Sequence, residues 1–168
     1  MNLLAHSNNL MRISSIAVML VISCAGCSSY TVDITDPTPE QLAESFVAAV
    51  QEQNQHKLAQ LIHPLCKMNL SPLEQKYIDY VIMKDLSHHI PLNAPMSIHD
   101  LKGWKPPEPN NDPRWPITPT HQIDIEIKTE EYSSISIGHY IVQDKGNWFI
   151  VIPVPNKETL ELYEKKVF

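Results

Sequence analysis

Glycine, cysteine and basic residues are all scarce in this chain of 168 residues. It has four glycines against fourteen prolines, so we expect turns built from Pro, Asn and Asp. Three cysteines are too few for a disulfide scaffold. Lys and Arg total 13 against 19 Asp and Glu, and an acidic chain without a basic block is a poor binder of nucleic acid.

Motifs of the large enzyme classes are missing as well. The sequence has no phosphate-binding loop, no nucleophile elbow and no dinucleotide fingerprint. We therefore expect no cofactor. What is present is a hydrophobic fraction of 43% in a chain of domain size, which is enough for one packed core.

The longest uncharged apolar run covers residues 13–23 and follows Arg12. A membrane-spanning helix needs roughly 20 such residues. This run is of the length typical of the apolar core of a signal peptide. Met11 and Arg12 would make a compact basic start for that peptide, so Met11 is an alternative first residue. We expect residues 1–23 to be removed as a signal segment.

This order of segments resembles a bacterial lipoprotein signal peptide, in which a small residue precedes a lipidated cysteine. Cys24, after the residues VIS, is the favoured site, and Cys27, after CAG, is the alternative. The resemblance implies acyl chains at the new N-terminus, which hold a protein to a bilayer almost irreversibly. No Asp follows either cysteine, so the resemblance implies residence in the outer membrane, with the protein on its periplasmic face.

Residues 24–37 are expected to form a polar tether, and residues 38–168 a single periplasmic α+β domain. Thr38, Pro39 and Gln41 make a helix start in which the Thr side chain caps the first turn. Ser71 opens another helix with the same capping pattern. We expect four helices. The first begins at Thr38 and the second covers about His56 to Ile62. The third covers Ser71 to near Ser87, and the last follows Asn156.

Apolar and polar residues alternate along residues 120–129 and 134–142, as in half-buried strands. Further strands are expected at 148–154, after a turn at 144–147, and more weakly at 96–104. A turn at 130–132 sets a register that a one-residue slip would destroy, because the slip moves the Ile rows to opposite faces. The predicted pairs are Ile127 with Ile135, Ile125 with Ile137, Ile123 with His139, Ile141 with Ile150, His139 with Ile152, and Ile137 with Val154.

N-terminal helices packed on a curved antiparallel sheet of about four strands, closed by a hairpin with Trp148, resemble the NTF2-like (cystatin-like) superfamily. The resemblance covers roughly residues 38–155 and rests on the helix TPEQLAESFVAAV, the segment LAQLIHP and the closing Trp strand. A short C-terminal helix after Pro155 and a long loop rich in Pro and Trp depart from that pattern. The superfamily includes isomerases, dehydratases and many non-enzymatic modules.

Two histidines, His121 and His139, share the apolar face of neighbouring strands in this register. In an NTF2-like domain that face lines the ligand pocket, so either ring could contact a ligand or act as a base. The plainer interpretation is a histidine at the sheet margin that bonds to the backbone. No carboxylate lies on that face, but a helix could supply one, and Asp79 and Asp85 are the nearest candidates.

A loop with six prolines between residues 103 and 119 carries Trp104, Arg114 and Trp115. A proline-stiffened loop with tryptophans loses little entropy on docking, so these residues are candidates for binding a partner. Alternatively, the two tryptophans fold back and close the open end of the sheet.

The remaining histidines and Cys66 give weaker evidence for a functional site. His88 and His89, with Asp85 and His99 nearby, lack the spacing of a closed zinc site, and we expect no metal. Cys66 is expected to be buried, or to form a disulfide with Cys27 if Cys24 is lipidated.

We therefore expect an outer-membrane lipoprotein whose periplasmic domain is a non-catalytic binding module for a small ligand or an envelope protein. The alternative is a small-pocket enzyme of the isomerase or hydrolase type that uses His121 or His139.

Overall fold

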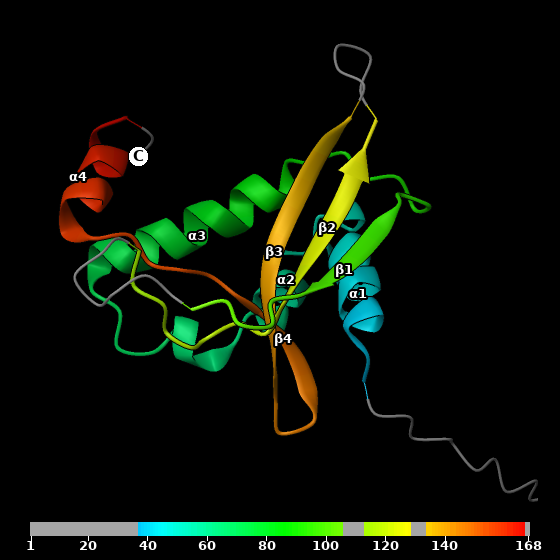
Figure 1. Cartoon of the computed structure of the whole chain (residues 1–168). Coiled ribbons are helices and arrows are strands. Elements are labelled where there is room, and N and C mark those ends of the chain that lie inside the picture. The colour runs from blue at the N-terminus through cyan, green and yellow to red at the C-terminus, as the bar shows by residue number, and fades with distance from the viewer. Residues whose placement is uncertain (1–36, 106–112, 129–133, 167–168) are drawn as a thin grey trace, which may run out of the picture. The chain divides into compact units, whose positions relative to one another are not determined.

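A computed structural model describes residues 37–105, 113–128 and 134–166 (Figure 1). No helix among these residues is long and apolar enough to cross a membrane. Several expectations lie outside the described residues: the signal segment 1–23, the start at Met11, the lipidation of Cys24 or Cys27, most of the tether 24–37, and the turn at 130–132.

Four α-helices lie in the described part of the chain, and the first and third begin as predicted. Thr38 and Gln41 form a complete capping box, and so do Ser71 and Glu74. Each box satisfies backbone N–H groups that the first helical turn leaves without an acceptor. The helices are α1 (Pro39–Gln51), α2 (Gln55–Leu61), α3 (Pro72–Leu86) and α4 (Lys157–Lys166), with a 3₁₀ turn at Pro64–Cys66.

Strands β1 (Met96–Asp100), β2 (His121–Ile127), β3 (Ile135–Asp144) and β4 (Asn147–Val151) form an antiparallel sheet in the order β1-β2-β3-β4. The predicted register between β2 and β3 is confirmed, as is the pairing of Ile141 with Ile150. Lys145 and Gly146 both have positive φ angles, which is the geometry of a two-residue hairpin turn. The expected α+β class is confirmed.

The last predicted strand is too long. β4 ends at Val151, so the predicted pairs of His139 with Ile152 and of Ile137 with Val154 are wrong. Pro153 and Pro155 have no N–H to donate to a ladder. Val154 instead exchanges two backbone hydrogen bonds of 2.8 Å with Arg114.

The first strand is also shorter than its prediction of 96–104. It ends at Asp100, where the backbone turns so that the N–H of Trp104 donates to the carbonyl oxygen of Leu101 over 2.8 Å. Gly103 has a φ of 81° in this turn, a conformation that side chains disfavour. Because of this turn, the chain at Trp104 no longer continues along the line of β1.

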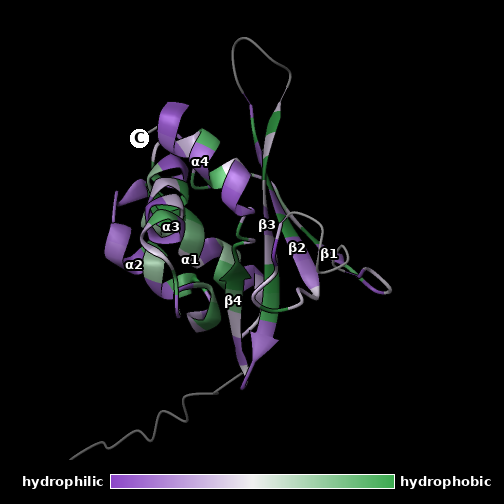
Figure 2. Ribbon diagram, turned by 90° about the vertical axis from the view of Figure 1, so that its left-hand side faces the viewer, coloured by the Kyte–Doolittle hydropathy of each residue, from purple (hydrophilic) through white to green (hydrophobic). Residues whose placement is uncertain are grey.

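The helices cover one face of the sheet, and Figure 2 shows them all on the same side of it. Residues that alternate along β2, β3 and β4 point to that side and form the core with α1 and α3. We call this the inner face and the opposite one the outer face. Buried on the inner face are Ile123, Ile125, Ile127, Ile137, Ile141 and Ile150.

Candidate functional site

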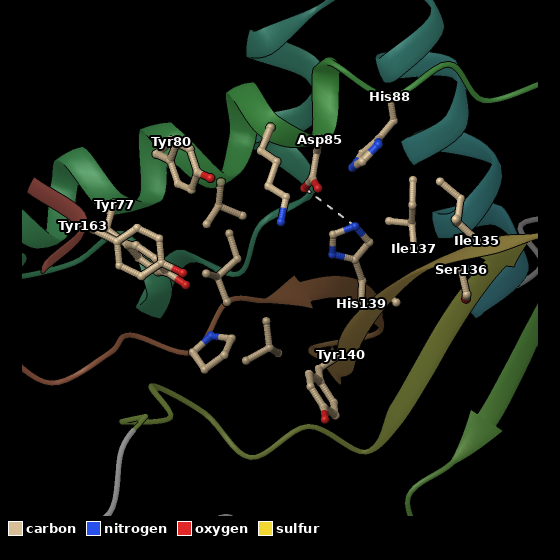
Figure 3. Close-up of a pocket in the computed structure, with 16 residues that line it drawn as sticks. Tyr77, Tyr80, Asp85, His88, Ile135, Ser136, Ile137, His139, Tyr140 and Tyr163 are labelled. Atoms are coloured by element: carbon tan, nitrogen blue, oxygen red, sulfur yellow. Dashed lines mark ion pairs between the residues drawn. The ribbon is translucent and has the colours of Figure 1, made fainter. Parts of the chain in front are cut away.

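A cavity of about 400 Å³ lies between α3 and β3, and Tyr163 of α4 lines it as well (Figure 3). One wall comes from α3, where Tyr77, Val81 and Asp85 are spaced four residues apart and so share one side of the helix. The opposite wall comes from residues 135–140 of β3. The cavity therefore opens where the C-terminal half of α3 crosses the sheet.

Asp85 and His139 meet across this cavity. Their closest atoms, Asp85 Oδ2 and His139 Nε2, are 3.6 Å apart, and the two side chains are only 12% and 11% exposed. That distance is longer than a good hydrogen bond. His139 Nε2 is buried and has no hydrogen-bond partner among the described residues. The ring is held in place by Phe46 of α1, with 4.6 Å between ring centroids.

Burial shifts the two groups in opposite directions. It raises the pKa of Asp85 to about 7, although the nearby Lys84 ammonium lowers it. It lowers the pKa of His139 to about 4, and His88 lowers it further while Asp124 raises it. Near pH 7, His139 is therefore neutral and a substantial fraction of Asp85 is protonated. The pair can offer both a proton donor and a proton acceptor to a bound molecule.

Aromatic rings and a second histidine complete the cavity wall. The ring centroid of Tyr163 lies 5.3 Å from that of Tyr77 and 5.8 Å from that of Tyr80. His88 also lines the cavity, and the pKa of its ring is lowered by partial burial and by Lys84. These side chains give the cavity an aromatic side beside its polar end.

The structure separates the two histidines singled out in the sequence. His139 lines the cavity, whereas His121 is not among its lining residues. His121 lies against the ring of Trp148, at 5.0 Å between centroids, and its Nδ1 is 3.0 Å from the hydroxyl of Thr120. Of the two carboxylates suggested by sequence, Asp85 reaches His139, while Asp79 accepts a hydrogen bond from Gln75.

Trp104 and Trp115 fold back on the sheet rather than projecting from it. Their ring centroids are 5.0 Å apart, and both rings contact Tyr140, at 5.8 and 4.8 Å. The indole N–H of Trp115 is buried without an acceptor in the described part of the chain. Arg114 does not join them, because its guanidinium pairs with Glu74 on α3 at 2.7 Å.

The residues considered for a metal do not converge. No group of three or more His, Cys, Asp or Glu side chains that could hold a metal is found among the described residues. His99 lies on the outer face, where its Nε2 is 3.3 Å from Asp124 and 3.1 Å from the hydroxyl of Ser97. A serine–histidine–aspartate relay needs two different ring nitrogens for these contacts, so this trio is not one.

Cys66 is a free thiol with no exposed surface, and burial raises its pKa. A buried thiol with a raised pKa is a poor nucleophile. Its predicted partner in a disulfide, Cys27, lies outside the described residues.

Sequence reasoning missed one buried histidine–carboxylate contact. His63 Nδ1 accepts the N–H of Leu65, so its Nε2 carries the proton and faces Asp144 at 3.3 Å. Both ring nitrogens are therefore occupied, which makes the contact structural. The cue in the sequence was His63 directly before Pro64, a position that can cap the 3₁₀ turn.

No family model, curated protein or solved structure matches this chain. The function is therefore inferred from the chemistry of the site.

Proposed function

We propose that this chain is an outer-membrane lipoprotein whose NTF2-like periplasmic domain binds a small ligand in the cavity between α3 and β3. The apolar run 13–23 and Cys24 support the lipid anchor, and helices on one face of an open antiparallel sheet support the superfamily. The observation that carries the binding role is the buried His139 Nε2, which has no hydrogen-bond partner among the described residues and lies beside a partly protonated Asp85.

The cavity suits a small molecule with one polar end. Its volume of about 400 Å³ is within the range of small-molecule sites. A buried polar atom without a partner costs free energy, which a ligand recovers by supplying the missing hydrogen bond. A carbonyl or hydroxyl group at His139 and Asp85, with an aromatic or aliphatic body against Tyr163, uses both ends of the cavity.

Matched substitutions on α3 test the cavity as the binding site. Val81 lines it, so Val81→Phe should fill the space and abolish the rise in Tm that a bound small molecule gives the wild type. Met83 is exposed on the same helix, so Met83→Phe should leave that rise unchanged. A ligand that stabilises Val81→Phe as strongly as the wild type would rule out this cavity.

A second candidate function is proton transfer, as in an isomerase or hydrolase, and the Asp85–His139 pair favours it. The structure brings Asp85, not His121, to His139, so the enzyme alternative rests on this pair. Neutral His139 would accept a proton from the substrate, and protonated Asp85 would donate one. NMR of a ligand incubated with the wild type and with Asp85→Asn separates the two functions. A ligand that binds both and stays chemically unchanged indicates the binding module.

The alternative of an envelope protein as the bound partner rests on the tryptophan loop. Because Trp104 and Trp115 pack on Tyr140 and Arg114 pairs with Glu74, these three side chains do not present one joint surface. The small ligand is therefore the proposal that the geometry favours.

A further inference from the structure

The outer face of β1, β2 and β3 carries an ordered array of polar side chains. Asp124 is paired with Ser97 on one side and with Gly138 on the other, so all three positions face outward together. The four α-helices of the described residues lie on the inner side (Figure 2). The array consists of Ser97, His99, Gln122, Asp124, Glu126 and Ser136.

Asp124 is the centre of this array. Its carboxylate accepts two hydrogen bonds from the side-chain amide of Gln122, at 3.0 and 3.2 Å, and one from the hydroxyl of Ser136 at 3.4 Å. His99 Nε2 is 3.3 Å from its second oxygen. A side chain held by several partners is fixed in one orientation, as recognition of a particular ligand requires.

Gly138 makes room for that orientation. A Cβ atom placed on Gly138 would lie 2.9 Å from Asp124 Oδ1, which is too close for the carboxylate to stay where it is. The absence of a side chain at this position therefore lets Asp124 lie across β3.

Beside Asp124 the outer face is hollowed. An open depression of about 490 Å³ is lined by Pro95 and Met96 and by the polar residues Ser97, Asp124, Glu126, Ser134 and Ser136. These polar groups are hydrogen-bond partners for hydroxyls and amides, and their negative charge disfavours an anionic ligand.

An aromatic cluster lies at the other end of the outer face. Tyr140 is paired with Gln122 and so faces outward, and Figure 3 shows it on the opposite side of β3 from His139. Trp104 stacks on it with an angle of 29° between the rings, and Trp104 keeps part of its surface exposed. An apolar ring plane thus lies directly next to the polar array.

We propose that this outer face binds an uncharged glycan chain. A sugar ring has an apolar C–H face, which packs on an aromatic plane, and a rim of hydroxyls, which bond to fixed carboxylate, amide and hydroxyl groups. The array and Trp104 supply both on one open surface that an extended chain can follow. Asp124 and Glu126 select a glycan without carboxylate or phosphate groups. On β3 the outer face and the inner cavity share Ser136, Gly138 and Tyr140, whereas Trp104 and Asp124 do not line that cavity.

Titration of the full-length chain with N-acetylchitohexaose, followed by calorimetry, tests the proposal. The wild type should bind, and the anionic oligogalacturonate of equal length should not. Trp104→Ala should weaken binding at least tenfold. Trp148→Ala is the matched control, because Trp148 contacts His121 on the inner face, and it should leave the affinity within about twofold.

Two further variants keep the test decisive if Trp104→Ala lowers stability. Gly138→Ala displaces Asp124 and Asp124→Asn removes its charge, so each should weaken binding severalfold, whereas Asp79→Asn on α3 should not. Absence of wild-type binding at millimolar sugar overturns the proposal. So does binding that resists these changes, and so does binding lost in Val81→Phe, which would place the sugar in the inner cavity.

Discussion

Asp85 and His139 make opposite contributions to stability as the pH changes. The folded-state pKa of Asp85 is raised from 3.8 to about 7, so between these values the folded state binds more protons than the unfolded state. Stability from this group therefore falls as the pH rises from about 4 to 7. The pKa of His139 is lowered from 6.5 to about 4, so its contribution rises with pH over nearly the same range. In the wild type the two trends partly cancel.

Replacing either Asp85 or His139 should reveal the pH dependence of stability that the other residue contributes. Asp85→Asn should become more stable as the pH rises from about 4 to 6.5, and His139→Gln should become less stable from about 4 to 7. Each slope is limited to about 1.4 kcal/mol per pH unit for a single group. Urea unfolding at pH 4.5, 5.5 and 6.5 measures both. Equal slopes for the two variants would show that burial does not shift these groups as described. Asp79→Asn, on the exposed side of α3, is the control.

His63 illustrates a buried polar group with all its bonds made. Its ring is 3% exposed, bonds to Leu65 and Asp144, and meets Phe149 edge-on at 5.2 Å. His63→Ala should destabilise the domain by about 1–3 kcal/mol, because it removes these contacts and leaves the Leu65 N–H without an acceptor. Asp144→Asn keeps an oxygen acceptor and should cost less. Chemical denaturation of both variants checks the order, and an equal loss would contradict it.

At the level of elements, the sheet is held by rows of isoleucine on its inner face. Ile125 is fully buried and pairs with Ile137, so Ile125→Ala should cost about 2–5 kcal/mol as a large-to-small core change. Ile135 lies on the same face of β3 as Ile137, but its side chain is 39% exposed. Ile135→Ala is therefore the matched control and should cost well under half as much stability as Ile125→Ala. Unfolding midpoints in urea give both values. Similar losses at the two positions would contradict the burial difference.

These elements were predictable where a local pattern has one physical solution. The two-residue period of β2 and β3 fixed which Ile residues share a face, and a slip would have exposed them all. Capping at Thr38 and Ser71 located two helix starts, because side chain and backbone satisfy each other within four residues. The end of β4 was predicted too late, although Pro153 and Pro155 mark it locally. The pairing of Val154 with Arg114 was missed because Arg114 lies forty residues away in sequence.

The site was less predictable than the fold. The alternation of β3 put His139 on the inner face, but its carboxylate neighbour comes from α3 and depends on how that helix crosses the sheet. Asp85 could only be named as a candidate, together with Asp79. The outer-face array was missed entirely, since alternating polar residues also mark a merely solvated face, and only the hydrogen bonds of Asp124 distinguish the two.

At the scale of the whole molecule, the charge of the chain disfavours electrostatic binding to an anionic membrane surface. All 19 acidic residues follow Cys27, and 12 of the 13 basic ones do, so the chain after that point has a net charge of −7. Such a chain is repelled by anionic lipid headgroups rather than held by them. Among the described residues no helix is suited to span a bilayer. The proposed anchor therefore depends on one cysteine thiol.

Replacing that thiol is the direct test of the anchor. Cys24→Ser should abolish labelling by a clickable palmitate analogue and move the protein from the membrane fraction to the soluble fraction, because acylation needs the sulfur. Cys27→Ser is the matched control and should keep both label and membrane association. Label that persists in Cys24→Ser and disappears only in Cys27→Ser would move the lipid to Cys27. Label that survives in the double variant would contradict lipidation at this segment altogether, since neither candidate thiol would remain.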